Sequence, residues 1–205
     1  MSLAAVAGRT VGATPAPHPG SRADTFDMRW VDKVQGKFRA VFDSPEIADG
    51  AALFRAILWC DEYKEVYGTP RTDMSPVIVF RHQAIVLTMN DAYWKQYKVG
   101  KQHKMKGPDG KWGEVNPIRV TPTDTPPAFA NYNLEEFIKD GGIVLGCNLA
   151  FGEIVGRVQH DEKLAPEAAR TRALSLMIPG ITLQPSGVFA ALRAQEAGCK
   201  YIGAA

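Results

Sequence analysis

The sequence predicts a single α/β domain of three layers, in which helices cover both faces of a mostly parallel, five-stranded sheet. Three observations support this prediction. Short apolar segments suited to strands alternate with longer segments of helical spacing. Several of the short segments are almost continuously apolar, as strands covered on both faces are. The length of 205 residues suffices for one well-buried core and is short for two full-sized domains.

The alternation can be followed along the whole chain. The expected strands cover residues 37–43, 76–81, 143–147, 181–184 and 199–202. The expected helices cover residues 51–67, 90–99, 134–139, 148–158, 166–177 and 185–195. Asn90 and Asn133 are suitable caps for two of these helices, and Gly68 is a suitable stop for the first. Right-handed connections between parallel strands are therefore expected.

Two segments depart from the pattern. Residues 1–30 form a leader rich in Ala, Gly and Pro, which we expect to be flexible and to precede a domain at residues 31–205. The leader is no intact signal peptide; it could be the tether left after a signal was cleaved, or the remnant of an artificially trimmed end. The compartment stays open, with an exported, periplasmic protein favoured over a cytoplasmic one. An insertion at residues 100–127 is polar and rich in Gly and Pro, and its turn at residues 107–110 predicts a small hairpin.

Composition excludes several classes of protein. Hydrophobic residues make up 45% and charged residues 22%, as in ordinary globular proteins. The net charge of +2 is too small to indicate a nucleic-acid partner, and the basic stretch at residues 95–111 is interpreted as a solvated loop. No apolar run approaches the roughly 20 residues that cross a bilayer, so no membrane span is expected.

Cys147 is the main candidate for chemistry. It closes one expected strand and directly precedes an expected helix. Ligands of open parallel sheets bind outside the carboxyl ends of the strands, and a helix start stabilises an anion there. The position therefore favours a thiolate that acts as a nucleophile or persulfide carrier. The alternative is that Cys147 is a small apolar plug at the sheet edge.

Other candidate residues are weaker. His82 follows the second expected strand and could serve as a general base or hydrogen-bond donor, or have only a structural role. Asn148 begins the helix after Cys147 and is a candidate ligand-binding residue. Cys60 and Cys199 are expected in the core. The cysteines and histidines lack metal-ligand spacing and the glycines lack a nucleotide-binding pattern, so neither a metal nor a cofactor is expected.

Three pieces of the chain resemble the DsrE-like family, which includes sulfur-relay subunits and the related YchN-type proteins. Gly-Gly-Ile-Val-Leu-Gly-Cys-Asn at residues 141–148 is similar to the family's strand that ends in a cysteine. Val-Ile-Val-Phe-Arg-His at residues 77–82 is similar to its second strand, and residues 181–202 to its last helix and strand. The resemblance covers about residues 35–203. It implies that Cys147 carries persulfide sulfur and that subunits form trimers or hexamers, whereas the insertion and the leader depart from the family.

Two functions follow as hypotheses. The first is a sulfur carrier or thiol-dependent relay through Cys147, with a sulfur donor or acceptor protein as partner. The alternative is a noncatalytic, oligomeric module that binds a ligand or a partner at the crevice, with a structural Cys147. In either case the insertion is a candidate lid, or an arm that packs on a neighbouring subunit through Met105 and Trp112.

Overall fold

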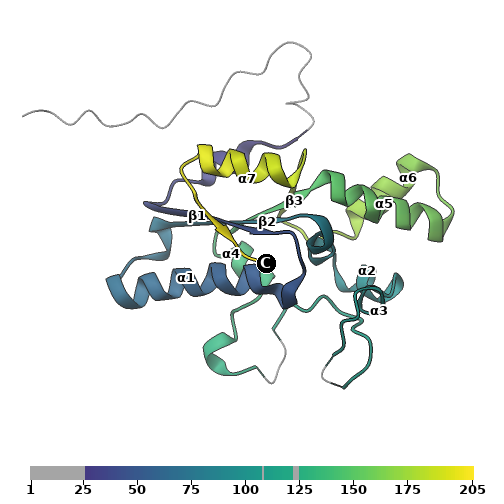
Figure 1. The fold of residues 1–205 in the computed structure, drawn as a ribbon, viewed down its shortest axis with the longest axis horizontal. Helices are drawn as coiled ribbons and strands as arrows, with labels where there is room; N and C mark the ends of the chain where they lie inside the picture. Colours follow the sequence, from purple (N-terminus) through teal and green to yellow (C-terminus); the bar gives the residue numbers. More distant parts are fainter. Residues whose placement is uncertain (1–25, 108, 122–124) are drawn as a thin grey trace, which may run out of the picture.

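The fold is built on one sheet whose strands all run parallel (Figure 1). The computed structural model describes residues 26–107, 109–121 and 125–205, so residues 1–25 of the expected leader lie outside the described residues. The strand order is β4-β3-β2-β1-β5. The strands are β1 (Phe38–Ser44), β2 (Met74–Phe80), β3 (Ile143–Cys147), β4 (Ile181–Gln184) and β5 (Lys200–Gly203). The predicted α/β class is confirmed, and the sheet is wholly rather than mostly parallel.

Helices connect the strands and cover both faces of the sheet. The α-helices are α1 (Ala51–Tyr67), α2 (Asp91–Gln96), α3 (Val99–Gln102), α4 (Leu134–Lys139), α5 (Asn148–Glu162), α6 (Pro166–Ser175) and α7 (Gly187–Glu196). The 3₁₀ helices are η2 (Arg29–Lys33), η3 (Ala48–Gly50), η4 (Arg71–Asp73), η5 (His82–Thr88) and η6 (Pro127–Phe129). None of the helices in the described ranges is long and apolar enough to span a membrane.

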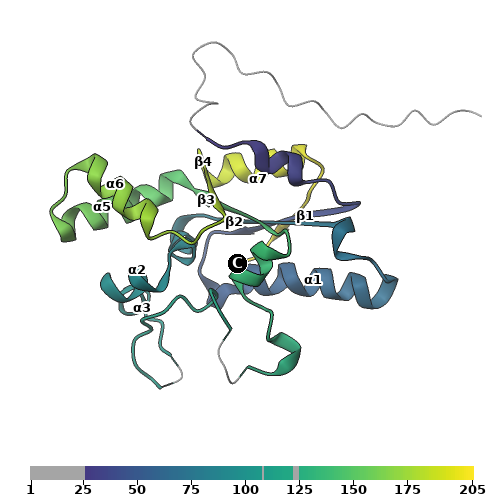
Figure 2. The same ribbon diagram turned by 180° about the vertical axis from the view of Figure 1, so that it is seen from behind.

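Two apolar cores separate the three layers. On one face, α7 and η2 cover the sheet (Figures 1 and 2). Trp30 of η2 is buried in this core with Val41, Val79 and Leu145. The other face carries α1, α4 and η5, with α5 and α6 extending beyond the carboxyl ends of the strands (Figure 2). β2 is buried at all of its residues, as its continuous apolar sequence predicts. Because Trp30 is 3% exposed, the folded domain includes a residue that the sequence assigned to the leader.

Most expected helices are present with shifted bounds. α1 ends where the sequence predicts, at Gly68, which has the left-handed φ of 65° of a C-terminal cap. The expected helix at residues 90–99 is two short helices, because Lys98 adopts a left-handed conformation with φ 52°. The sequence pattern indicated neither η2 nor η5, since 3₁₀ turns have little periodicity.

The insertion is anchored in the middle by buried polar contacts. The predicted hairpin is present, with a bridge between Lys106 and Trp112. The Asn116 side chain is 2% exposed and donates to the carbonyl oxygens of Leu87 and Met89 at 2.8 and 2.7 Å. Arg119 pairs with Asp91 at 2.6 Å. The described part of the insertion is therefore held against η5 and α2, over the carboxyl end of the sheet.

Candidate functional site

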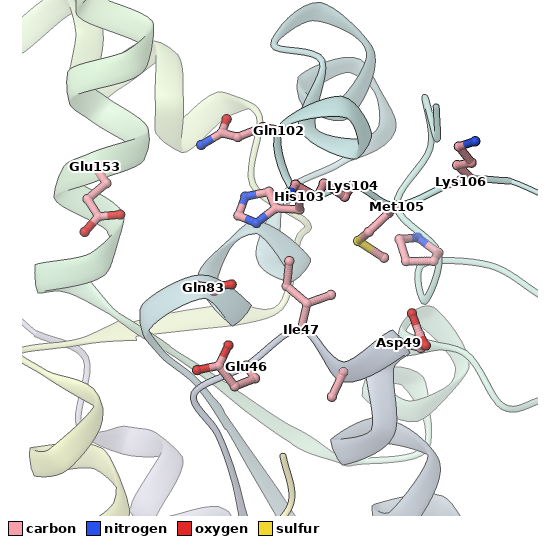
Figure 3. Close-up of a pocket in the computed structure, with 12 residues that line it drawn as sticks. Glu46, Ile47, Asp49, Gln83, Gln102, His103, Lys104, Met105, Lys106 and Glu153 are labelled. Atoms are coloured by element: carbon pink, nitrogen blue, oxygen red, sulfur yellow. The ribbon is translucent and has the colours of Figure 1, made fainter. Parts of the chain in front are cut away.

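A large opening lies at the carboxyl edge of the sheet, over the ends of β1 and β2 (Figure 3). We call it the strand-end cleft. Its volume is about 930 Å³. Four segments line it: the loop after β1, the start of η5, helix α5 and the insertion. The lining residues are Glu46, Ile47, Ala48, Asp49, Gln83, Gln102, His103, Lys104, Met105, Lys106, Pro117 and Glu153. The insertion thus forms one wall, as expected of a lid.

Strained backbone borders the strand-end cleft. Ala48 and Asp49 line it with left-handed φ angles of 39° and 49°, and Gly50 follows with φ 80°. His82, the second residue after β2, also has a left-handed φ of 47°. Such conformations cost a non-glycine residue on the order of 1 kcal/mol or more, and they concentrate at functional sites. These turns direct the loops after β1 and β2 toward the cleft.

Polar side chains from four segments surround one side of the opening. Figure 3 shows Glu153 of α5, Gln102 of α3, His103, Gln83 of η5 and Glu46 around the same space, whereas Lys106 points away. None of these five surrounding side chains makes a hydrogen bond or ion pair with another residue in the described ranges. Ile47 and Met105 lie on the other side of the opening, where Asp49 and Lys104 are also found (Figure 3), and Pro117 completes the apolar part of the lining. Free polar groups that face an apolar wall are typical of sites for small molecules.

His82 belongs to the same region. A neighbouring cavity of about 370 Å³ contains His82 and shares Gln83, Gln102, His103 and Glu153 with the strand-end cleft. The predicted site residue His82 therefore lies beside the cleft. Partial burial lowers the pKa of His103, because desolvation disfavours the imidazolium. At neutral pH His103 is then a neutral group that can both donate and accept a hydrogen bond.

Cys147 lies deeper at the same edge. Its Cα pairs in register with that of Gln184 at the end of β4. From here the chain enters α5 on one face and α7 on the other, which is where the rule for open parallel sheets locates a crevice. The residue is 6% exposed and packs within the apolar core, and its Sγ accepts a hydrogen bond from the Ala150 amide at 3.5 Å. The thiol therefore caps α5, and it does not line the strand-end cleft.

Asn148 contacts another helix. Its Oδ1 accepts a hydrogen bond from Nη2 of Arg170 at 2.8 Å, which ties the start of α5 to α6. The structure therefore does not bring the three predicted site residues to one opening: His82 borders the strand-end cleft, Cys147 is buried, and Asn148 is engaged by Arg170.

A buried charge cluster at this edge was not anticipated. Asp43, 3% exposed at the end of β1, accepts two hydrogen bonds from Arg81 at 2.8 Å and one from the Tyr201 hydroxyl at 2.7 Å. The carbon chain of Arg81 packs on Gly187, where a Cβ would come within 2.5 Å of it. The cluster joins β1, β2, β5 and α7, so it fixes the strand ends that carry the cleft loops. An acidic residue at the end of an apolar strand was the only signal for it in the sequence.

The remaining cysteines have no role at the cleft. Burial raises the pKa of the Cys60 and Cys199 thiols to about 11, so both stay protonated at neutral pH. Both are in the core, as predicted. Among the described residues, no group of three or more His, Cys, Asp and Glu side chains is arranged to hold a metal ion.

No family model and no curated protein matches the chain. The resemblance to the DsrE-like family therefore stays a prediction. The chain is an α/β protein with a wholly parallel sheet and a cleft at the strand ends.

Proposed function

We propose that the chain is a noncatalytic binding module that takes a small polar ligand in the strand-end cleft, with Cys147 in a structural role. The observation that carries this proposal is the set of unpaired polar side chains around the opening, which are Glu46, Gln83, Gln102, His103 and Glu153. Each can bind a ligand without breaking an existing contact. The strained turns after β1 and β2 support the same site.

The lining indicates which ligands suit the cleft. Glu46 and Glu153 only accept hydrogen bonds when ionised, while the two glutamines and neutral His103 can both donate and accept. The polar side therefore favours a ligand rich in hydrogen-bond donors, such as an amine. The apolar wall of Ile47, Met105 and Pro117 favours a ligand that also has a hydrocarbon part.

Assembly into several copies is part of the proposal. Val188 and Leu192 lie one turn apart on α7 and are 61% and 55% exposed, with Phe189 beside them at 39%. An apolar stripe of this kind is more typical of a protein contact than of a solvated helix face. It supports the homo-oligomer that the family resemblance implies.

The proposal is tested by titrating benzylamine, an ammonium group on an apolar ring, while amide chemical shifts are recorded. We expect shifts at residues 46–49, 102–106 and 153, with a dissociation constant of about 1–10 mM for so small a molecule. Glu153→Gln should weaken binding about two- to threefold, because the ammonium group loses its ion pair with this solvent-exposed carboxylate. Glu167→Gln, on exposed α6, is the matched control and should not change it.

Two further probes distinguish an error in the proposed ligand class from an error in the proposed site. Glucose and benzoate replace the ammonium group by neutral hydroxyls and by a carboxylate. If glucose but not benzylamine shifts the cleft resonances, the site stands and the amine preference is wrong. If none of the three probes perturbs residues 46–49 and 102–106, the binding function itself is contradicted.

Sulfur carriage is the second candidate function. The observation in its favour is the amide of Ala150, which donates to the Cys147 sulfur at the start of α5. The same geometry would stabilise a persulfide anion. The burial of Cys147 is evidence against this role, since a donor protein must reach the sulfur.

A further inference from the structure

A second cavity lies at the opposite edge of the sheet from the strand-end cleft. It is bounded by α1, by η4 just before β2, by α4 and by residues 127–132 near the end of the insertion. Its volume is about 300 Å³. We call it the amino-edge pocket; the residues that matter here are Ile57, Cys60, Thr69, Arg71, Tyr132 and Phe137.

Arg71 lines this pocket and has an unpaired donor. Its Nη1 donates to the carbonyl oxygen of Met74 at 3.0 Å. Its Nη2 is buried, yet it has no hydrogen-bond partner among the described residues, and the guanidinium forms no ion pair with them. A buried donor without an acceptor costs about 1–3 kcal/mol, and more when the group is charged. An acceptor that carries a negative charge would remove this cost.

The charges of the pocket differ with depth. Cys60, Thr69 and Phe137 are each less than 9% exposed and surround the deep end. Burial raises the pKa of Cys60 to about 11, and the Arg71 charge acts in the opposite sense. Arg71 also lines the pocket, and its Nη2 is buried.

The rim carries charges of both signs. Asp61, Lys64 and Asp140 line the pocket and are exposed to solvent, and Asp61 accepts a hydrogen bond from the Tyr132 hydroxyl at 2.8 Å. Solvent screens exposed charges, so their effect on a ligand inside is small. The two rim carboxylates are partly offset by Lys64.

We propose that the amino-edge pocket binds a small carboxylate ligand whose acid group pairs with Arg71 and whose apolar part packs on Ile57 and Phe137. A guanidinium has two parallel N–H donors that match the two oxygens of a carboxylate, which no other side chain offers. The Thr69 hydroxyl, which makes no hydrogen bond within the described ranges, offers a further donor. This site is separate from the strand-end cleft and does not depend on the function proposed there.

Benzoate and benzamide test the proposal, because they differ only in the charged group. In wild-type protein we expect benzoate to shift the amide resonances of residues 57–71 and 132–137, with a dissociation constant of about 1–10 mM. Benzamide should bind at least about tenfold more weakly, because it cannot form the charged pair. Equal binding of the two molecules, or no binding of benzoate up to about 50 mM, would overturn the proposal.

Variants test whether benzoate contacts Arg71. Arg71→Gln should weaken benzoate binding at least tenfold, and Arg71→Lys should weaken it less, since the charge remains but the fork is lost. Lys64→Gln is the rim control and should change it less than about twofold. Glu153→Gln in the strand-end cleft should leave it unchanged. If Arg71→Gln does not fold, the comparison of benzoate with benzamide in the wild-type protein still tests the proposal.

Discussion

Replacing Asp43 with alanine is expected to lower the free energy of unfolding by about 3–5 kcal/mol. The substitution removes the carboxylate that holds Arg81 and Tyr201, and it leaves the guanidinium of Arg81, whose side chain is only 22% exposed, without an ion-pair partner. Breaking one side of a buried ion pair costs more than the pair contributes, because the remaining charge stays desolvated. Urea denaturation followed by circular dichroism measures the change.

Two variants make this measurement specific. Tyr201→Phe removes one hydrogen bond to the same carboxylate and should cost about 1 kcal/mol. Glu136→Gln removes an ion pair on the surface of α4 and should cost less than about 1 kcal/mol. If Asp43→Ala costs no more than Glu136→Gln, the cluster does not hold the strand ends together.

Replacing Asn116 with alanine should cost about 2–4 kcal/mol. The amide side chain donates to the carbonyls of Leu87 and Met89 and accepts from the Ile118 amide at 3.1 Å. Alanine leaves these three buried groups unpaired, at roughly 1 kcal/mol each. Because Asn116 anchors the insertion, residues 100–121 should also become more susceptible to limited proteolysis.

The adjacent residue supplies the control for this variant. Val115 is 59% exposed, and Val115→Ala should stay within about 0.5 kcal/mol of wild type with unchanged proteolysis. Should Asn116→Ala behave like Val115→Ala in both assays, the insertion is not anchored through Asn116. The wall that it forms for the strand-end cleft would then rest on other contacts.

The sheet could be predicted because burial leaves a local signal. Continuous apolar runs such as β2 reveal strands covered on both faces, and Gly68 reveals the end of α1. The anchoring of Asn116 could not be predicted, since its partners lie more than 25 residues away in the sequence. The same holds for Trp30, whose burial depends on α7.

The sequence assigned its candidate residues to the carboxyl edge of the sheet but did not indicate how deeply each is buried there. Position at a strand end located Cys147 and His82, because parallel strands bring their carboxyl ends together. The burial of each residue depends on how α5 and α7 pack over that edge, and no local sequence pattern indicates this packing. The unpaired polar residues of the cleft, such as Gln83 and Gln102, come from segments without periodicity, so the sequence did not single them out.

The structural role proposed for Cys147 is tested most directly by its alkylation rate in the folded protein. Iodoacetamide labelling at neutral pH, resolved by peptide mass spectrometry, compares Cys147 with Cys60 and Cys199, which are also buried and serve as internal controls. We predict that each of the three reacts at least about 100-fold more slowly than it does in urea. Fast labelling of Cys147 alone, with a one-sulfur mass gain from a persulfide donor that Cys147→Ser abolishes, would contradict this account and establish sulfur carriage.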